Sequence, residues 1–266
     1  MKVMALSDIH IDHPANRAWI DGLSPSEHRS DLLLIAGDVS DSLTRLAHCF
    51  KQLTARFAKV LFVPGNHELW VMRDGGIDSF AKFRAIERLA AEHEVSMRPF
   101  HCGLLSIVPL LSWYDYSFGE PCEQLHERWM DFHACRWPGA MAPAEVCRTF
   151  LQMNERSLLT RNRTVISFSH FVPRPDLLED ARAGITRLLH PVMGSLALEA
   201  QVRRLAPDIH VYGHSHRRKA VTLDGTLYVN HAAGYPAEQY DGLPTLRCVH
   251  EFDPVQQPFA ISSRHS

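Results

Sequence analysis

Short apolar runs alternate along the chain with segments whose apolar residues recur at helical spacing. Residues 2–7 (KVMALS), 32–36 (LLLIA) and 60–63 (VLFV) are apolar runs of strand length. In residues 42–57, between the second and third runs, apolar side chains recur every three or four positions, which predicts an amphipathic helix. Strands that lack polar alternation are buried on both faces. The pattern therefore predicts β–α–β units and an α/β fold.

The rest of the chain continues this alternation. Residues 80–93 (FAKFRAIERLAAEH) predict a second amphipathic helix, and the apolar stretches 104–111, 165–168 and 210–212 predict further strands. A helix over residues 192–205 is entered through Gly194, with Ser195 as its candidate N-cap. Asp224 and Gly225 separate the apolar residues 220–223 and 227–230, which predicts a β-hairpin. The final residues have no clear period and are expected to form a surface tail.

The periodicity breaks down over residues 112–143, a segment that contains three of the five tryptophans. We expect one domain over residues 1–266, with residues 112–143 as an insertion or lid over the mouth of a site. The start of this segment has two interpretations, either the lining of a substrate pocket or a satellite core or dimer patch. The residues concerned are Trp113, Tyr114, Asp115 and Tyr116.

The charge, the cysteines and the N-terminal residues limit the partners and the cellular location that we expect. The chain has 28 basic and 30 acidic residues and a formal net charge of −2, so no overall positive field favours nucleic acid. The six cysteines are widely spread without a C-x-x-C pair, which favours reduced thiols. The first residues (MKVMALSDIH) are too short an apolar run for a signal peptide or a membrane span. We expect a cytoplasmic protein that does not engage a membrane.

Polar side chains gather just after the predicted strands. In an α/β sheet the carboxyl ends of the strands form the edge at which binding sites arise, because the loops converge there on a rigid support. Residues two apart in an extended segment also point the same way and can meet one ion. The residues that follow strands are Asp8, His10, Asp38, Asn66, His67, Glu68, His170, His214 and His216.

Seven of these side chains form a set of potential metal ligands. The set contains carboxylates, imidazoles and one amide but no thiolate, which suits manganese, iron or zinc. Seven ligands are too many for one tetrahedral site, so two ions are predicted, a pairing that suits phosphoryl transfer. The predicted ligands are Asp8, His10, Asp38, Asn66, His170, His214 and His216.

The order of these motifs resembles that of the calcineurin-like metallophosphoesterase superfamily. The blocks are DIH (8–10), GD (37–38), GNHE (65–68), SH (169–170) and GHSH (213–216). The resemblance implies a four-layer αββα sandwich of two mixed β-sheets flanked by helices, with a two-metal site at the carboxyl edge of the strands. It also implies a hydroxide that bridges the two ions and attacks a phosphate ester in line.

The resemblance further implies how the ligands are shared. One ion is held by Asp8, His10, Asp38 and His216, and the other by Asp38, Asn66, His170 and His214, with Asp38 as the bridge. We expect His67 to be the general acid that serves the leaving group. Glu68 either supports the His67 ring from behind or braces the loop.

The expected activity is that of a metal-dependent phosphoesterase. We favour a phosphomonoesterase acting on a small metabolite, a nucleotide or a phosphoprotein, because the chain is nearly neutral. The alternatives are a phosphodiesterase of the cyclic-nucleotide or nuclease type, or a non-catalytic scaffold. Arg174, which follows His170 by four residues, either clamps a substrate phosphate or is an ordinary surface arginine. The pattern predicts no oligomeric state.

Overall fold

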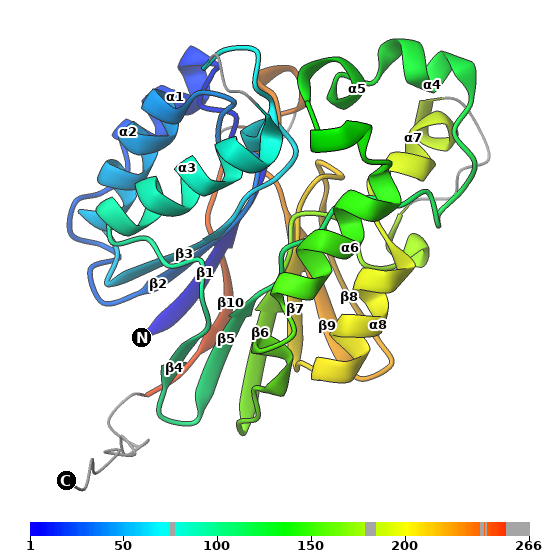
Figure 1. The fold of residues 1–266 in the computed structure, drawn as a ribbon. Coiled ribbons are helices and arrows are strands. Elements are labelled where there is room, and N and C mark those ends of the chain that lie inside the picture. The colour runs from blue at the N-terminus through cyan, green and yellow to red at the C-terminus, as the bar shows by residue number, and fades with distance from the viewer. Residues whose placement is uncertain (75–77, 179–184, 240–241, 243, 254–266) are drawn as a thin grey trace, which may run out of the picture.

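Two β-sheets face each other and carry helices on their outer faces (Figure 1). The computed structural model describes residues 1–74, 78–178, 185–239, 242 and 244–253. The strand order is β10-β1-β2-β3 in one sheet and β4-β5-β6-β7-β9-β8 in the other. The arrangement confirms the expected four-layer αββα sandwich.

The first sheet is built from the N-terminal β–α–β units and one late strand. Its strands are β1 (Lys2–Leu6), β2 (Leu32–Ala36), β3 (Lys59–Val63) and β10 (Arg247–Glu251). β1, β2 and β3 are parallel, whereas β10 pairs antiparallel to β1. Its outer helices are α1 (Pro14–Asp21), α2 (Leu43–Thr54) and α3 (Ser79–Glu92) (Figure 1). The two predicted helices of this half are confirmed, but α1 and β10 were not predicted.

The second sheet is parallel at its centre and antiparallel at both edges. Its strands are β4 (Phe100–Cys102), β5 (Leu105–Pro109), β6 (Thr164–Phe168), β7 (Ile209–Tyr212), β8 (Arg218–Leu223) and β9 (Thr226–His231). The predicted hairpin is confirmed as β8 and β9. Asp224 and Gly225 form its turn with φ values of 49° and 86°.

Helices of the second half cover the outer face of this sheet and the upper edge of the molecule (Figure 1). They are α4 (Glu123–Arg128), α5 (Asp131–Ala134), α6 (Pro143–Met153), α7 (Ile185–Met193) and α8 (Leu196–Leu205). Short 3₁₀ helices are η1 (His67–Leu69), η2 (Pro138–Ala140), η3 (Ser157–Leu159), η4 (Pro175–Leu177) and η5 (Pro236–Glu238).

The helix predicted over residues 192–205 is divided in two. α7 ends at Met193, and α8 begins at Leu196. Ser195 is extended, with φ −150°, and its Oγ accepts hydrogen bonds from the amides of Ala197 and Leu198 at 3.0 and 3.3 Å. The N-cap prediction for Ser195 is therefore confirmed. Because Ser195 is extended, α7 and α8 do not form one continuous helix.

The core occupies the space between the sheets and the space beneath the helices. Along β1, Val3 and Ala5 belong to the inter-sheet cluster, whereas Met4 and Leu6 belong to the cluster that includes the helices. This alternation follows from the two-residue period of a strand. Burial of each large apolar side chain contributes about 1.5–3 kcal/mol, so a shift of one residue in register would be strongly unfavourable.

The segment 112–143 joins the core at its start. Trp113 and Tyr114 are each 1% exposed and pack in the main apolar cluster. Asp115 accepts a hydrogen bond from Ser195 Oγ at 2.7 Å, and Tyr116 packs against the same cluster. Trp113 and Tyr114 thus belong to the main core rather than to a satellite core or a dimer patch. None of residues 113–116 lines the cavity described below, to which later residues of this segment contribute.

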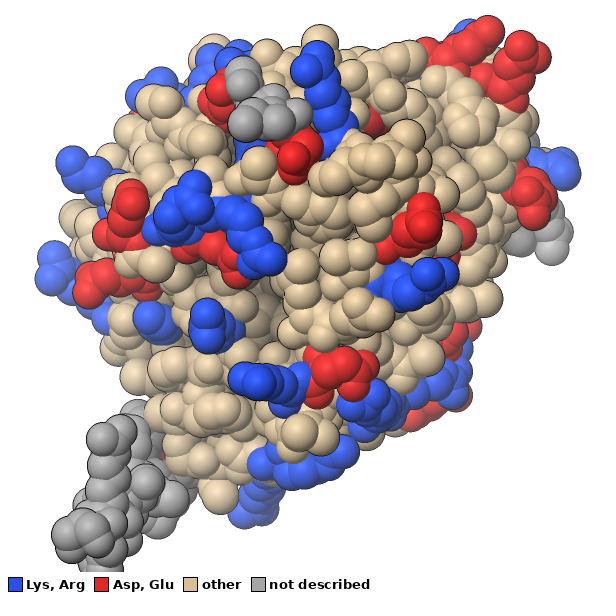
Figure 2. Space-filling model, viewed as in Figure 1, with Lys and Arg blue, Asp and Glu red and all other residues tan. Residues whose placement is uncertain are grey.

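The distribution of surface charges and the state of the cysteines agree with the near-neutral charge and the scattered cysteines of the sequence. Acidic and basic side chains are interspersed on the face shown in Figure 2. All six cysteines are free, and Cys49, Cys102 and Cys147 are buried. No helix within the described ranges has the length and apolar character needed to cross a membrane. Most of the predicted C-terminal tail, residues 254–266, lies outside the described residues.

Candidate metal centre

The carboxyl ends of strands from both sheets meet at one place. The loops after β1, β2 and β3 approach it from the first sheet, and those after β6 and β7 from the second. The structure therefore brings together residues that lie far apart in the sequence. Those it brings together are the seven predicted ligands and His67.

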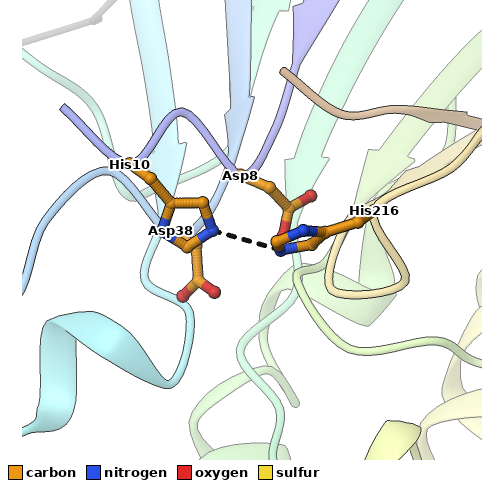
Figure 3. A group of neighbouring side chains, drawn as sticks. All are labelled: Asp8, His10, Asp38 and His216. Atoms are coloured by element: carbon orange, nitrogen blue, oxygen red, sulfur yellow. Dashed lines mark hydrogen bonds and ion pairs between the residues drawn. The ribbon is translucent and has the colours of Figure 1, made fainter. Parts of the chain in front are cut away.

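One group of side chains lies at the β1 side of this site. The ligand atoms of Asp8, His10, Asp38 and His216 all lie within 4.8 Å of one another. Figure 3 shows His10 and His216 pointing toward each other, with their Nε2 atoms 3.1 Å apart. Two imidazole nitrogens and two carboxylates around one point form a donor set that suits a divalent cation.

A second group lies beside the first and shares a residue with it. Ligand atoms of Asp38, His170 and His214 also lie within 4.8 Å of one another. His170 Nε2 is 3.0 Å from His214 Nδ1 and 3.1 Å from Asn66 Oδ1. Asp38 belongs to both groups, which is the position that a bridging carboxylate would need.

Hydrogen bonds on the outer side of the rings orient three of the histidines. His170 Nδ1 lies 2.8 Å from the carbonyl oxygen of Ala36, and His214 Nε2 lies 3.1 Å from that of Val192. A carbonyl can only accept, so each ring donates there and presents its other nitrogen to the site. His216 Nδ1 lies 2.7 Å from the carboxylate of Glu238, which leaves Nε2 inward.

The pKa shifts of the predicted ligands also favour the binding of cations at this site. Burial, Glu68 and Asp8 raise the pKa of Asp38 well above its usual range, because negative charges are gathered there away from water. Burial and the neighbouring imidazoles lower the pKa of His10 and that of His214, so both rings are neutral and have a lone pair available for a metal. A divalent ion would relieve the repulsion among the carboxylates.

The backbone at these residues is unusual. Five of the predicted ligands have φ values between 46° and 67°, a region that residues with a side chain rarely adopt. They are Asp8, His10, Asp38, His214 and His216. The expectation of an extended backbone is wrong for both the D-x-H and the H-x-H pair. Asp8 and His10 still belong to one group, whereas His214 and His216 belong to different groups, as the family resemblance implies. Left-handed turns send His214 and His216 to different groups.

Two glycines allow the loops to approach closely. Gly37 has φ +82°, and a Cβ atom there would lie 2.4 Å from Nδ1 of His170. A Cβ atom on Gly65 would lie 2.1 Å from Oδ1 of Asp38. Any larger residue would displace a predicted ligand, which explains the glycine in the GD and GNHE blocks.

Of the two roles considered for Glu68, the structure agrees with the bracing of the loop, through backbone amides. Its fully buried carboxylate accepts hydrogen bonds from four backbone amides at 2.6–2.9 Å. The donors are Asp38, Val39, Ser40 and Gly65. Both of its oxygens are thus directed at backbone amides rather than at the His67 ring. Glu68 clamps the loop after β2 to the loop after β3, and a carboxylate is needed because only acceptors can face four donors.

Asp131 is a site residue that sequence reasoning missed. One of its oxygens accepts from Asn66 Nδ2 at 2.9 Å and from Trp70 Nε1 at 2.7 Å, and the other accepts from Trp129 Nε1 at 2.8 Å. The bond to Nδ2 turns Asn66 Oδ1 toward His170. Burial raises the pKa of Asp131 to about 6, although these bonds favour the charged form. No motif marks Asp131, because Asn66 and Trp70 reach it from the loop after β3.

His67 lies at the edge of the cluster. Its ring stacks on Trp70 with centroids 3.8 Å apart, and its Nε2 is 3.8 Å from Oδ2 of Asp38. Burial, followed by the charges of His170 and His216, lowers the pKa of His67 to about 3. The ring is therefore neutral in the protein alone. An anion bound beside it would favour the protonated form.

A cavity of about 510 Å³ opens from the cluster. Asp38, Asn66, His67 and His216 are among the residues that line it. Apolar side chains from the 112–143 segment and from around η4 and α7 also line it, beside the charged Arg128 and Asp131. These apolar residues are Trp129, Met130, Leu177, Leu178, Leu189 and Met193. Such a space is large enough for an organic group attached to a phosphate.

Arg174 is placed away from this cavity. Its guanidinium forms two hydrogen bonds with Asp176, at 2.9 and 2.7 Å, and one with Asp224 at 2.6 Å. Glu199 lies a further 3.7 Å from its Nε. The structure thus favours neither interpretation of Arg174, because the residue is not among those that line the cavity, its guanidinium is engaged by carboxylates of the chain, and it is only 9% exposed.

Comparisons with known proteins agree with this geometry. The model of the family described as calcineurin-like phosphoesterase matches residues 1–218. The chain is 34% identical over 123 residues to the [acyl-carrier-protein] phosphodiesterase PptH of Mycobacterium tuberculosis, a match that covers 43% of this chain and only 38% of that protein. The crystal structure of the phosphopantetheinyl hydrolase PptH from the same organism superimposes with a TM-score of 0.80 and 24% identity, covering 93% of this chain and 95% of that one.

The family match spans most of the chain and includes all five motif blocks. The family implies a dinuclear centre of divalent metals, and the two groups of side chains are candidates for it. The chain therefore belongs to the calcineurin-like phosphoesterase family.

Proposed function

We propose that this chain is a phosphodiesterase that removes a phosphopantetheinyl group from an acyl carrier protein. The support from comparison is the name of the relative in Mycobacterium tuberculosis, an acyl-carrier-protein phosphodiesterase. The matched part spans 38% of that relative, so the substrate comes to this chain as a proposal.

The cavity beside the cluster is the structural observation on which the proposal depends. A simple phosphate would fill only a small part of about 510 Å³. The phosphopantetheine arm is a chain of methyl, methylene and amide groups, and its apolar parts suit a wall that contains Trp129, Met130 and Leu178. Burial of such an arm would supply binding energy next to the phosphate.

We propose the ligand assignment that the two groups of side chains suggest. Asp8, His10, Asp38 and His216 would hold one ion, and Asp38, Asn66, His170 and His214 the other. Two divalent ions at this place supply Lewis acidity and neutralise charge during phosphoryl transfer. The donors of nitrogen and oxygen suit manganese, iron or zinc.

The remaining roles belong to side chains near the phosphate. Hydrolysis joins a water oxygen to phosphorus, breaks the bond from phosphorus to the serine oxygen of the carrier, and leaves that oxygen with a proton. His67 is our candidate for the donor of this proton, because its Nε2 lies 3.8 Å from Asp38 Oδ2, at the edge of the cluster where the phosphate would bind. Trp70 supports the ring by stacking, which fixes its plane.

A monoesterase is the second candidate function. The near-neutral charge that favoured a small phosphorylated substrate still applies, and the same pair of metals would serve either ester. The two candidates differ in the size of the group that must fit, and this difference is open to a direct assay.

The test uses the full-length protein loaded with Mn²⁺ and three substrates. They are a phosphopantetheinylated acyl carrier protein, bis(p-nitrophenyl) phosphate and p-nitrophenyl phosphate. We expect release of phosphopantetheine, measured by mass spectrometry, together with hydrolysis of the diester in preference to the monoester. Chelator should abolish these activities, and His67→Ala should lower kcat roughly 100-fold or more.

His101→Ala is a matched control for the loss of an imidazole. His101 is exposed on β4, at the opposite end of the strands from the cluster. That variant should retain wild-type kcat. Cleavage of the monoester alone would contradict the proposal and favour the monoesterase, whereas inactivity of the Mn²⁺-loaded protein on all three substrates would contradict both.

A further inference from the structure

A second cavity adjoins the first. It measures about 350 Å³ and shares Leu177, His216, Arg217 and Glu238 with the larger cavity. The junction is therefore the predicted ligand His216 itself, with the carboxylate that orients it. A phosphate held beside His216 would therefore lie next to both cavities. A diester has two arms that leave phosphorus in different directions, so two openings meeting at this point suit a diester.

The second cavity has the opposite chemistry from the first. Arg217, Arg218 and Lys219 follow one another along its wall, and we call these residues the basic groove. Arg218 Nε donates to the carbonyl of Ala232 at 3.3 Å, and Lys219 Nζ donates to that of Leu177 at 3.1 Å. Carbonyl oxygens orient these side chains without neutralising them. Within the described ranges neither Arg218 nor Lys219 forms an ion pair with a carboxylate.

The acidic residue in this wall is already engaged. Glu238 accepts from His216 Nδ1 at 2.7 Å and from the amide of Tyr235 at 2.9 Å. Arg218 and Lys219 therefore give the groove a local positive charge on a chain whose net charge is −2.

We propose that the basic groove binds acidic side chains of the carrier protein that flank its modified serine, while the apolar cavity receives the pantetheine arm. This inference rests on the function proposed above. Charge complementarity favours an acidic partner, and the shared wall with the first cavity places that partner beside the phosphate. A single nucleic acid strand fits less well, because the groove wall contains no Phe, Tyr or Trp on which bases could stack.

The experiment compares two double charge reversals in the Mn²⁺-loaded full-length protein. Arg218→Glu with Lys219→Glu alters the basic groove. Arg161→Glu with Arg163→Glu is the control, because both are exposed next to the start of β6, at the opposite end of the strands. The measured quantity is kcat/KM for phosphopantetheinylated acyl carrier protein divided by kcat/KM for bis(p-nitrophenyl) phosphate. Arg218→Glu alone is a second variant in case the double change disturbs folding.

We expect this ratio to fall about tenfold or more in the groove variant, mainly through KM, and to change less than about twofold in the control. The difference should shrink in high salt, because the contacts are charged and exposed. An unchanged ratio in the groove variants would overturn the groove while leaving the proposed function intact. The contrary result is a single-stranded oligonucleotide that inhibits cleavage of the carrier protein by the wild type but not by the groove variant. That result would indicate that the groove binds nucleic acid instead. A wild-type protein that cleaves only the small diester would overturn both proposals.

Discussion

At the scale of single residues, the metal centre holds backbone conformations that its residues do not favour on their own. Asp8, His10 and Asp38 have φ values of 52°, 46° and 56°. Such conformations cost on the order of 1–3 kcal/mol each and persist only where surrounding contacts impose them. Four backbone amides on Glu68 are such contacts. The strain and the clamp together place ligands that a relaxed loop would leave apart.

Glu68→Gln should therefore weaken both the fold and the site. The amide of glutamine has only one acceptor oxygen, and its NH₂ group would face amides that also donate. We expect the free energy of unfolding, measured by urea titration, to fall by about 2–4 kcal/mol, and Mn²⁺ content after reconstitution to fall as well. Glu87→Gln, in an exposed i,i+3 pair on α3, is the control and should change stability by less than about 0.5 kcal/mol. A Glu68→Gln protein as stable as this control would refute the clamp.

At the scale of elements, the segment between β5 and β6 reaches back to the loop after β3. Asp131, the first residue of α5, receives hydrogen bonds from Asn66 and from Trp70 just beyond η1. The indole of Trp70 in turn stacks on the His67 ring. A short helix with little periodicity thus orients one predicted ligand and supports the candidate proton donor. The predicted lid over residues 112–143 stays a prediction, although Arg128, Trp129, Met130 and Asp131 do line the cavity.

Asp131 should act as a positioning residue for the metal centre. We expect Asp131→Ala to lower Mn²⁺ affinity by roughly 10–100-fold, because Asn66 would lose the bond that fixes its amide. Asp131→Asn should restore part of this loss, since one oxygen would still accept from Asn66 and Trp70. Metal titration by calorimetry measures the effect. Asp115→Ala in the same segment is the control, and equal affinities for Asp131→Ala and this control would argue against the role.

At the scale of the whole molecule, the site depends on two sheets that pack against each other. The first sheet supplies Asp8, His10, Asp38 and Asn66, and the second supplies the remaining predicted ligands from the loops after β6 and β7. The inter-sheet core, to which Ile209 and Val211 of β7 belong, holds the two strand edges in place. His210, between them on β7, is buried on the opposite, helix-covered face of the sheet, with hydrogen bonds of 2.8 and 3.1 Å to the hydroxyls of Ser167 and Ser169.

His210 should contribute to loss of stability in acid. Burial lowers its pKa from 6.5 to about 3. Between these values the unfolded chain binds a proton that the folded protein does not, so stability falls as pH drops through this window. At pH 5 the loss from this ring is about 2 kcal/mol. Urea titrations at pH 7 and pH 5 measure how much unfolding free energy each protein loses on acidification. This loss should be smaller in His210→Gln than in the wild type by that amount. His126 is exposed, so the His126→Gln control should lose as much stability between pH 7 and pH 5 as the wild type does. A wild-type loss in His210→Gln would contradict the prediction.

Much of the fold was predictable because hydrophobic spacing is a local property. The strands β1, β2, β3 and β6 and the hairpin of β8 and β9 agree with the apolar runs to within one or two residues. β10 escaped prediction because its burial is only partial, and its pairing with β1 joins opposite ends of the chain. Pairing across such a distance leaves no local pattern.

The sequence by itself determined which chemical groups stand at the ends of the strands, and hence the family and the metal-dependent chemistry. Apolar spacing sets where a strand ends, and the polar residues that follow are fixed by the chain order. The tertiary structure alone decided that Glu68 binds backbone amides, that Asp131 reaches Asn66, and that carboxylates engage Arg174. These outcomes depend on distances between loops, which arise from how the two sheets pack and not from any local pattern of residues.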